Sequence, residues 1–141
     1  ERYNESATIE AGSQPVVFDA PFGRVGVSIC YDIRFPELYR AQGAVDLQII
    51  PAAFTETTGR AHWEILLRAR AIENQCYVLA VAQGGKHENG RETHGNSMLI
   101  DPWGIILDRL PKGPGVVVGD VDHARIADVR ASLPALKHRV M

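Results

Sequence analysis

The chain has 141 residues, 45% of them hydrophobic and 23% charged, which is the composition of a single globular domain and excludes an intrinsically disordered chain. Lys and Arg number 15 against 17 Asp and Glu, so the net charge of −2 provides no basic excess for binding a nucleic-acid backbone. No apolar stretch approaches the roughly 20 residues that cross a bilayer, and no charged leader precedes an apolar stretch, so we expect a cytoplasmic protein without a membrane partner.

The first third of the chain is predicted to form a loop, two strands and a helix. Residues 1–14 are polar, and strands are predicted at Val16–Phe18 and Arg24–Cys30, where apolar residues recur with the period of a strand. A helix is predicted over Glu37–Gln42, because this stretch follows a proline and ends at a glycine.

The rest of the chain is predicted to alternate strands and helices and then to continue mainly in strands. Strands are predicted at Leu47–Ile50, Tyr77–Ala82, Ser97–Ile100, Ile105–Leu110 and Val116–Val121, and helices at His62–Asn74 and Ala124–Ser132. Residues 83–94 are predicted to be a polar loop, and no linker or internal repeat divides the chain. These elements predict an α/β fold bordering on α+β, with one mixed sheet and helices on one face.

Cys30 is the strongest candidate for a reactive side chain. It is predicted to lie at the end of a buried strand, directly before the polar run Tyr31–Arg34, and α/β folds place reactive groups in the loops at strand ends. A thiol there can act as a nucleophile when a base or a cation lowers its pKa, and a buried structural cysteine is the alternative. Cys76 lies at a predicted helix-to-strand junction and is expected in the core. The two cysteines are too few for a disulfide framework.

Other types of site have weaker support. Ser28 lies in Gly26–Cys30, which lacks the second glycine of the G-x-S-x-G turn of serine hydrolases. His87 and His94 share one predicted loop, but their spacing is too loose for a usual zinc site. No glycine-rich phosphate-binding motif occurs. We therefore expect neither a metal nor a nucleotide cofactor.

Several motifs, taken in order along the chain, resemble those of one family of hydrolases. They are Gly26–Glu37, Pro51–Phe54, Gly59–Glu64, Arg68–Asn74, Gly95–Met98 and Asp101–Gly104. This order is similar to that of the nitrilase superfamily, the carbon–nitrogen hydrolases, and most similar to its Nit branch, whose members hydrolyse ω-amides and deaminated glutathione. The resemblance implies an α-β-β-α sandwich, in which residues 1–141 would be a single partial domain that supplies one sheet and its helices.

The resemblance also implies a mechanism and a set of site residues. The family uses a Glu-Lys-Cys triad with a second, assisting glutamate: the cysteine attacks the amide carbon, ammonia leaves, and water hydrolyses the thioester. Cys30 corresponds to the nucleophile and Glu5 to the assisting glutamate, with Glu10 as the alternative carboxylate. The backbone N–H of Tyr31 would be an oxyanion donor, and Phe54 would line the pocket.

The chain departs from the family pattern at two triad positions. In the family the first glutamate and the lysine precede the position of Glu5, whereas the three lysines of this chain, at positions 86, 112 and 137, all follow Cys30. We therefore expect the C-terminal half of an amidase that acts, as a longer protein, on a small-molecule amide; a non-catalytic fragment or assembly subunit is the alternative. Because two predicted strands are apolar on both faces, we also expect a homo-oligomer.

Overall fold

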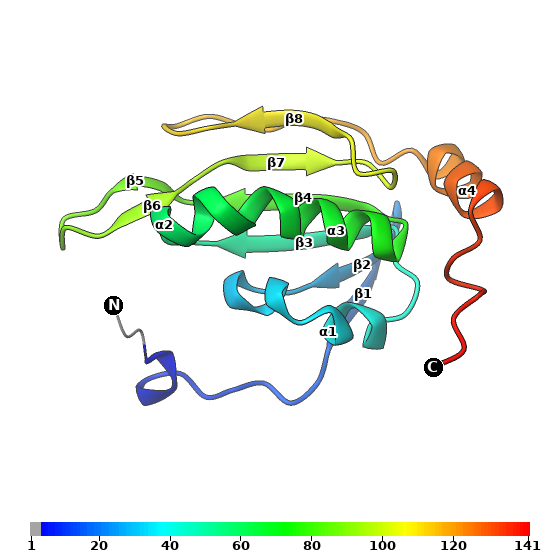
Figure 1. Cartoon of the computed structure of the whole chain (residues 1–141), viewed down its shortest axis with the longest axis horizontal. Coiled ribbons are helices and arrows are strands. Elements are labelled where there is room, and N and C mark those ends of the chain that lie inside the picture. Colours follow the sequence, from blue (N-terminus) through cyan, green and yellow to red (C-terminus); the bar gives the residue numbers. More distant parts are fainter. Residues whose placement is uncertain (1–3) are drawn as a thin grey trace.

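The computed structural model describes residues 4–141, which form one mixed β-sheet with helices packed against it (Figure 1). The strands of this sheet are β1 (Val16–Ala20), β2 (Gly23–Val27), β3 (Leu47–Ala52), β4 (Tyr77–Ala82), β7 (Ser97–Ile100) and β8 (Ile106–Leu110). They lie in the order β1-β2-β3-β4-β7-β8. A separate two-stranded hairpin consists of β5 (Gly84–Lys86) and β6 (Glu92–His94).

Helices lie between the parallel strands, before β1 and after β8. They are the 3-10 helices η1 (Glu5–Ala7) and η2 (Cys30–Arg34), the π-helical turn η3 (Gly59–Trp63), and the α-helices α1 (Pro36–Ala41), α2 (Glu56–Thr58), α3 (Glu64–Asn74) and α4 (His123–Ser132). Strands β2, β3 and β4 are parallel, and α1 and α3 lie in the two crossovers that parallel pairing requires. None of the helices in residues 4–141 is long and apolar enough to cross a bilayer.

The main core lies between the sheet and the helices α1 and α3, on one face. Because side chains alternate along a strand, every second residue of β3, β4 and β7 points to this face. The core residues from the strands are Ile50, Ala52, Val78, Ala80, Met98 and Ile100, and those from the helical side include Tyr39, Trp63, Leu67 and Ala71. Each fully buried large apolar side chain here stabilises the fold by about 1.5–3 kcal/mol. The α/β class is thus confirmed.

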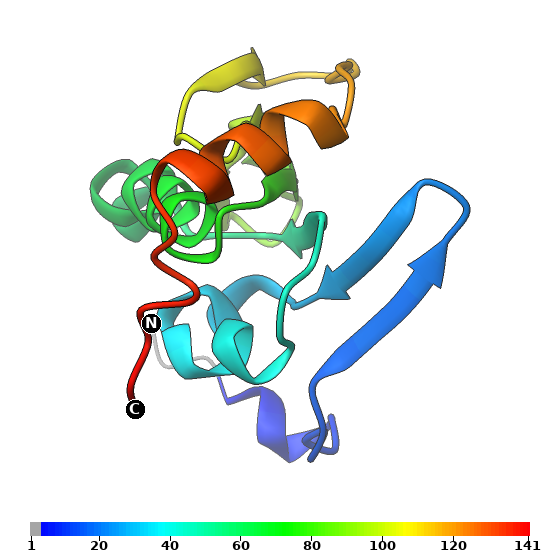
Figure 2. The same cartoon turned by 90° about the vertical axis from the view of Figure 1, so that its right-hand side faces the viewer.

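The opposite face of the sheet is only partly covered. Helix α4 packs there, and its Ile126 belongs to one buried cluster with Leu47, Tyr77 and Leu99. The expectation that the helices lie on one face only is therefore wrong. The cause is the chain beyond β8, which returns along this face and brings α4 to one end of the sheet (Figure 2). Figure 2 also shows the hairpin of β1 and β2 extending away from the helices.

Three predictions about individual elements are wrong, each for a local physical reason. Strand β2 ends at Val27 and not at Cys30, because Cys30 takes a left-handed backbone conformation (φ 49°) and begins η2. Residues 83–94 are not an open loop but contain the hairpin of β5 and β6. Val116–Val121 is not a strand: the Val118 N–H donates to the Asp108 carboxylate at 2.9 Å and not to a strand backbone.

Candidate active site

Cys30 lies in a strained turn at the carboxyl end of β2. Its φ of 49° belongs to the left-handed region, which costs a residue other than glycine about 1–3 kcal/mol and persists only where the surroundings hold it. The side chain is half-buried and packs against the main core. The resulting sharp change of direction ends the strand and starts η2 at the residue that carries the thiol.

The turn is closed by Asp32. Its carboxylate accepts a hydrogen bond from the Ile29 N–H at 2.8 Å, and its own N–H donates to the Ile29 carbonyl at 3.0 Å. The Phe35 N–H then donates to the Asp32 carbonyl at 3.0 Å, which ends η2. Asp32 is therefore a structural part of the turn, with its carboxylate engaged by backbone.

The backbone N–H of Tyr31 follows directly after Cys30. It is one of the first amides of η2, which a short helix leaves without a carbonyl partner, and no acceptor for it exists within residues 4–141. An unpaired amide beside a thiol is the arrangement that can stabilise negative charge on a carbonyl oxygen under attack. The Tyr31 ring is exposed and packs edge-on against Phe35, with centroids 5.4 Å apart.

Arg34 is a further candidate site residue, which the sequence did not single out. Its guanidinium lies over the Phe54 ring, 5.1 Å from the centroid, and 5.7 Å from the centroid of the Tyr31 ring. Its Nη1 donates to His62 Nδ1 at 3.3 Å, and no carboxylate in the described part of the chain pairs with it. The structure thus brings Tyr31 and Phe54 together around an arginine whose charge has no carboxylate partner among residues 4–141. The polar run after Cys30 was the available signal.

Phe54 is more deeply placed than a residue that only lines a pocket. It is buried in the main core, and its ring packs on Trp63 at a centroid distance of 4.9 Å. The Trp63 Nε1 donates to the Asn96 carbonyl at 3.0 Å, which fixes this pair of rings. Phe54 therefore presents its ring to Arg34 from a rigid base at the end of β3.

The two carboxylates expected to assist catalysis lie on the surface. Glu5 begins the exposed helix η1, and Glu10 follows it in an exposed segment. Among residues 4–141, neither carboxylate makes a hydrogen bond or ion pair, and the Cys30 sulfur has no hydrogen-bond partner. The structure therefore places Cys30, Tyr31 and Phe54 in one region but joins neither glutamate to it by a contact.

Lys112 is held by two carboxylates and, within residues 4–141, makes no contact with the Cys30 turn. Lys112 Nζ lies 3.1 Å from a Glu56 carboxylate oxygen and 3.2 Å from one of Glu92, so its charge is already balanced. The hydrogen bonds from Arg60 and Lys112 lower the pKa of Glu56 to about 2. These groups form a cluster that joins α2, η3, β6 and the segment after β8.

The other candidate residues from the sequence are held by contacts within the fold. Ser28 is buried, and its hydroxyl lies 2.7 Å from the Tyr39 hydroxyl. Cys76 is in the core as expected, and burial raises its pKa to about 12. His87 and His94 belong to the hairpin, where the first contacts Thr93 and the second faces Glu56. No group of three metal-ligating side chains occurs in the part of the chain that the structure describes.

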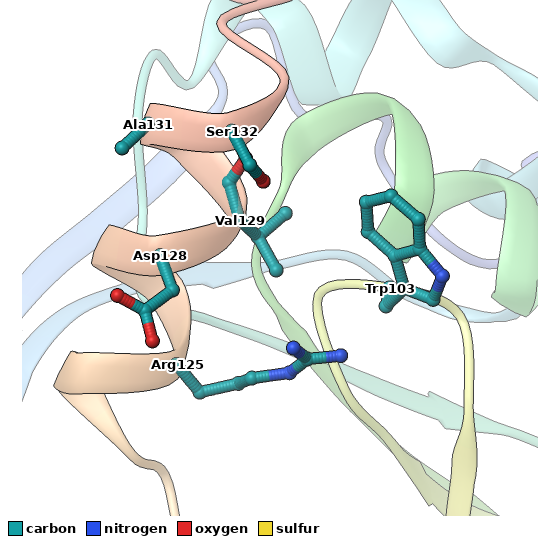
Figure 3. A pocket seen from close by; sticks show the side chains of 6 residues that line it. All are labelled: Trp103, Arg125, Asp128, Val129, Ala131 and Ser132. Atoms are coloured by element: carbon teal, nitrogen blue, oxygen red, sulfur yellow. The ribbon is translucent and has the colours of Figure 1, made fainter.

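An open recess of about 640 Å³ lies elsewhere, between α4 and the turn that joins β7 to β8 (Figure 3). Its lining residues are Trp103, Arg125, Asp128, Val129, Ala131 and Ser132. None of them belongs to η2 or to the segment around Phe54, so this recess is not part of the Cys30 region.

The chain is similar to several known proteins. Residues 1–131 match the family model described as carbon-nitrogen hydrolase. A deaminated glutathione amidase from Synechocystis sp. is 52% identical over 143 residues, which is 98% of this chain and 52% of the relative. Nit3 of Saccharomyces cerevisiae, a member of branch 10 of the nitrilase superfamily, superposes with a TM-score of 0.88 and 33% identity, over 97% of this chain and 51% of its own.

A further solved structure bears on the thiol. The amidase from Nesterenkonia sp. AN1 is 31% identical, with a TM-score of 0.72 over 92% of this chain and 51% of its own. A mutant of it shows a Michael addition of acrylamide at the active site cysteine. The chain spans about half the length of the curated relatives it matches.

Proposed function

Because the chain belongs to the carbon–nitrogen hydrolase family, we propose that it supplies the nucleophile of an amidase and that this nucleophile is Cys30. The sulfur adds to the amide carbon, the C–N bond breaks, and the nitrogen leaves as ammonia with the proton that the thiol gave up. Water then cleaves the thioester, which releases the carboxylate product and restores the thiol. This is a hydrolysis of a non-peptide C–N bond.

One observation carries this proposal: the half-buried Cys30 occupies a strained turn whose next amide, the Tyr31 N–H, has no acceptor among residues 4–141. A carbonyl attacked by the thiol would receive its developing negative charge next to this N–H. Removal of one such donor typically costs a factor of 10²–10³ in rate.

We propose that the substrate is a small amide that also carries a carboxylate, with deaminated glutathione as the first compound to test. The support is the name of the relatives, deaminated glutathione amidase, together with the chemistry around Arg34. Its guanidinium rests on the rings of Tyr31 and Phe54 without a carboxylate partner in the described chain. Arginine is the side chain best suited to bind a carboxylate through two parallel hydrogen bonds.

The rest of the machinery is proposed from the family pattern. Glu5, with Glu10 as the alternative, would be the assisting carboxylate. The lysine and the first glutamate of the pattern would come from polypeptide outside residues 1–141, since they precede Glu5 in the family, whereas all three lysines of this chain follow Cys30. We further propose a homo-oligomer in the cytoplasm, where the two free thiols stay reduced.

The test compares two cysteine variants in the full-length protein. Cys30→Ala is expected to abolish ammonia release from deaminated glutathione and from simple ω-amides, whereas the matched control Cys76→Ala retains it. Mass spectrometry of acid-quenched reactions should find the acyl group on the peptide that contains Cys30. Turnover by Cys30→Ala would contradict the assignment, and absence of turnover by the unmodified protein would favour a non-catalytic assembly subunit.

A further inference from the structure

Two buried side chains hold the backbone on either side of Cys30. Before it, the Ser28 hydroxyl lies 2.7 Å from the hydroxyl of Tyr39 on α1. After it, Arg70 on α3 donates from Nε and Nη2 to the Ile33 carbonyl, at 3.0 and 2.8 Å. Ser28, Tyr39, Ile33 and Arg70 are all at most 4% exposed. The Cys30 turn is thus tied to both helices of the main core.

The two contacts belong to one cluster. The Arg70 guanidinium lies over the Tyr39 ring, 5.6 Å from its centroid, and its third nitrogen donates to Glu73 at 3.0 Å. A buried guanidinium is costly unless its donors are satisfied, and here two of its three nitrogens serve a single backbone carbonyl. That carbonyl lies near the end of η2, a helix too short to satisfy its own termini.

The Tyr39 contact does not depend on the protonation of the thiol. Burial raises the pKa of Tyr39 to about 12, so its hydroxyl keeps its proton throughout the range in which a thiol ionises. The Ser28–Tyr39 pair therefore has the same hydrogen bond whether Cys30 is thiol or thiolate.

We propose that Tyr39 and Arg70 are positioning residues for the Cys30 nucleophile, acting as a brace across the strained turn. The inference rests on the function proposed above and extends it to residues that do not touch the substrate. A residue other than glycine keeps a left-handed backbone only where its neighbours hold it in that conformation. The brace holds the backbone before and after Cys30. Its effect is to fix the thiol relative to the Tyr31 N–H, so it governs kcat and leaves substrate binding unchanged.

The first experiment removes one hydroxyl at a time in the full-length protein. Tyr39→Phe and Ser28→Ala are each expected to lower kcat about tenfold or more, with KM within about twofold, since small misplacements of reacting groups can cost up to 10²-fold. The double variant replaces both partners by apolar groups and is expected to recover thermal stability, because no buried hydroxyl is left unpaired. Its kcat should nevertheless stay low, which separates positioning from stability.

The second experiment tests the charged half of the brace. Arg70→Lys keeps the charge but cannot place two donors on one carbonyl, so kcat is expected to fall while KM and the pH midpoint of kcat stay unchanged. Arg68→Met is the matched control on the same helix: Arg68 donates to the Gly104 carbonyl, away from the turn, and its loss should leave kcat unchanged.

All rates are divided by the amount of protein in which iodoacetamide modifies Cys30 but leaves the buried Cys76 unmodified, so that misfolded protein does not count. The proposal is overturned if kcat per titrated thiol is unchanged in Tyr39→Phe and Arg70→Lys, or if KM alone changes. If the unmodified protein has no amidase activity, the proposed function fails separately. In that case, amide hydrogen exchange of residues 30–34 tests whether the brace holds the turn. Faster exchange in Tyr39→Phe would support the brace, and unchanged exchange would overturn it.

Discussion

At the scale of single residues, the two cysteines show how one functional group can lie in two different environments. Cys30 is half-buried at a turn beside the Tyr31 N–H, which has no acceptor among residues 4–141, whereas Cys76 is enclosed in the core. Burial opposes the charged thiolate, which is the reactive form, and raises the pKa of Cys76 to about 12. The chemistry of the chain therefore depends on position and not on residue type.

This difference predicts the order of alkylation. In the native protein at neutral pH, iodoacetamide is expected to modify Cys30 first, since Cys76 offers neither access nor thiolate. Peptide mapping by mass spectrometry at increasing reaction times measures the order, and denatured protein serves as the control in which both thiols react. Modification of Cys76 before Cys30 would contradict the assignment of the nucleophile.

Arg34 leads to a prediction about specificity. Arg34→Met is expected to raise KM roughly tenfold or more for a carboxylate-bearing amide, because a hydrogen bond to a charged group is worth about 1.5–3 kcal/mol. A neutral amide of the same length should be affected little. For Arg34→Lys, the KM for the carboxylate-bearing amide is expected to lie between that of Arg34→Met and that of the unmodified protein. Lysine keeps the positive charge but lacks the two parallel N–H donors of a guanidinium. Equal losses for charged and neutral amides would show that Arg34 does not contact the carboxylate.

At the scale of elements, the β5–β6 hairpin is attached to α2 by charge. Lys112 bridges Glu56 on α2, at 3.1 Å, and Glu92 of β6, at 3.2 Å, and His94 of β6 lies 3.6 Å from the same Glu56 carboxylate. Close packing supports the charges: a Cβ on Gly59 would lie 2.3 Å from the Cβ of His94, so only glycine fits at the start of η3. The polar residues between 83 and 94 thus form an ordered hairpin held against α2.

This cluster predicts a pH dependence of stability. The pKa of Glu56 is lowered to about 2 in the folded chain, so its contribution is complete above its unfolded value near 4.3 and is lost as pH falls toward 2. Glu56→Gln is therefore expected to lower Tm at pH 7, and the difference from the unmodified protein should shrink between pH 4.5 and 2. Thermal melts across this range measure it. A difference that is constant with pH would show that the charge is not responsible.

At the scale of the whole molecule, the sheet has one well-covered face and one that is partly open. On the open face Val16, Phe18 and Val81 are 56%, 47% and 51% exposed, because α4 covers only one end of it. The sandwich that the family resemblance implies would place a second sheet over these side chains. Exposed apolar area of this kind on a sheet is a site of association.

This face predicts the behaviour of residues 1–141 expressed alone. The polypeptide is expected to elute in size-exclusion chromatography well above 15.5 kDa and to release no ammonia from ω-amides. A double variant, Phe18→Lys with Val81→Lys, should shift the elution toward the monomer by making the open face polar. A monomer with full turnover would contradict both the proposed association and the need for further triad residues.

The sequence by itself determined the class of fold and the chain neighbours of Cys30, the proposed nucleophile. Period-two strands and a helix ending before Gln75 follow from local patterns, and the order Cys30–Tyr31 already implies a thiol next to an amide donor. The motifs between Gly26 and Gly104 also indicated the family, which the match over residues 1–131 confirms. These features depend on residues close together in the chain, and periodicity reports them directly.

Only the tertiary structure decided how the turn is held and what surrounds it. Arg70 reaches the Ile33 carbonyl across 37 positions, and Tyr39 reaches Ser28 across 11. Arg34 meets Phe54 only because the parallel pairing of β2 with β3 brings the ends of both strands to one edge. Likewise, α4 covers the far face only because the chain after β8 returns along it. Such contacts depend on how crossovers pack, which no local pattern of polar and apolar residues specifies.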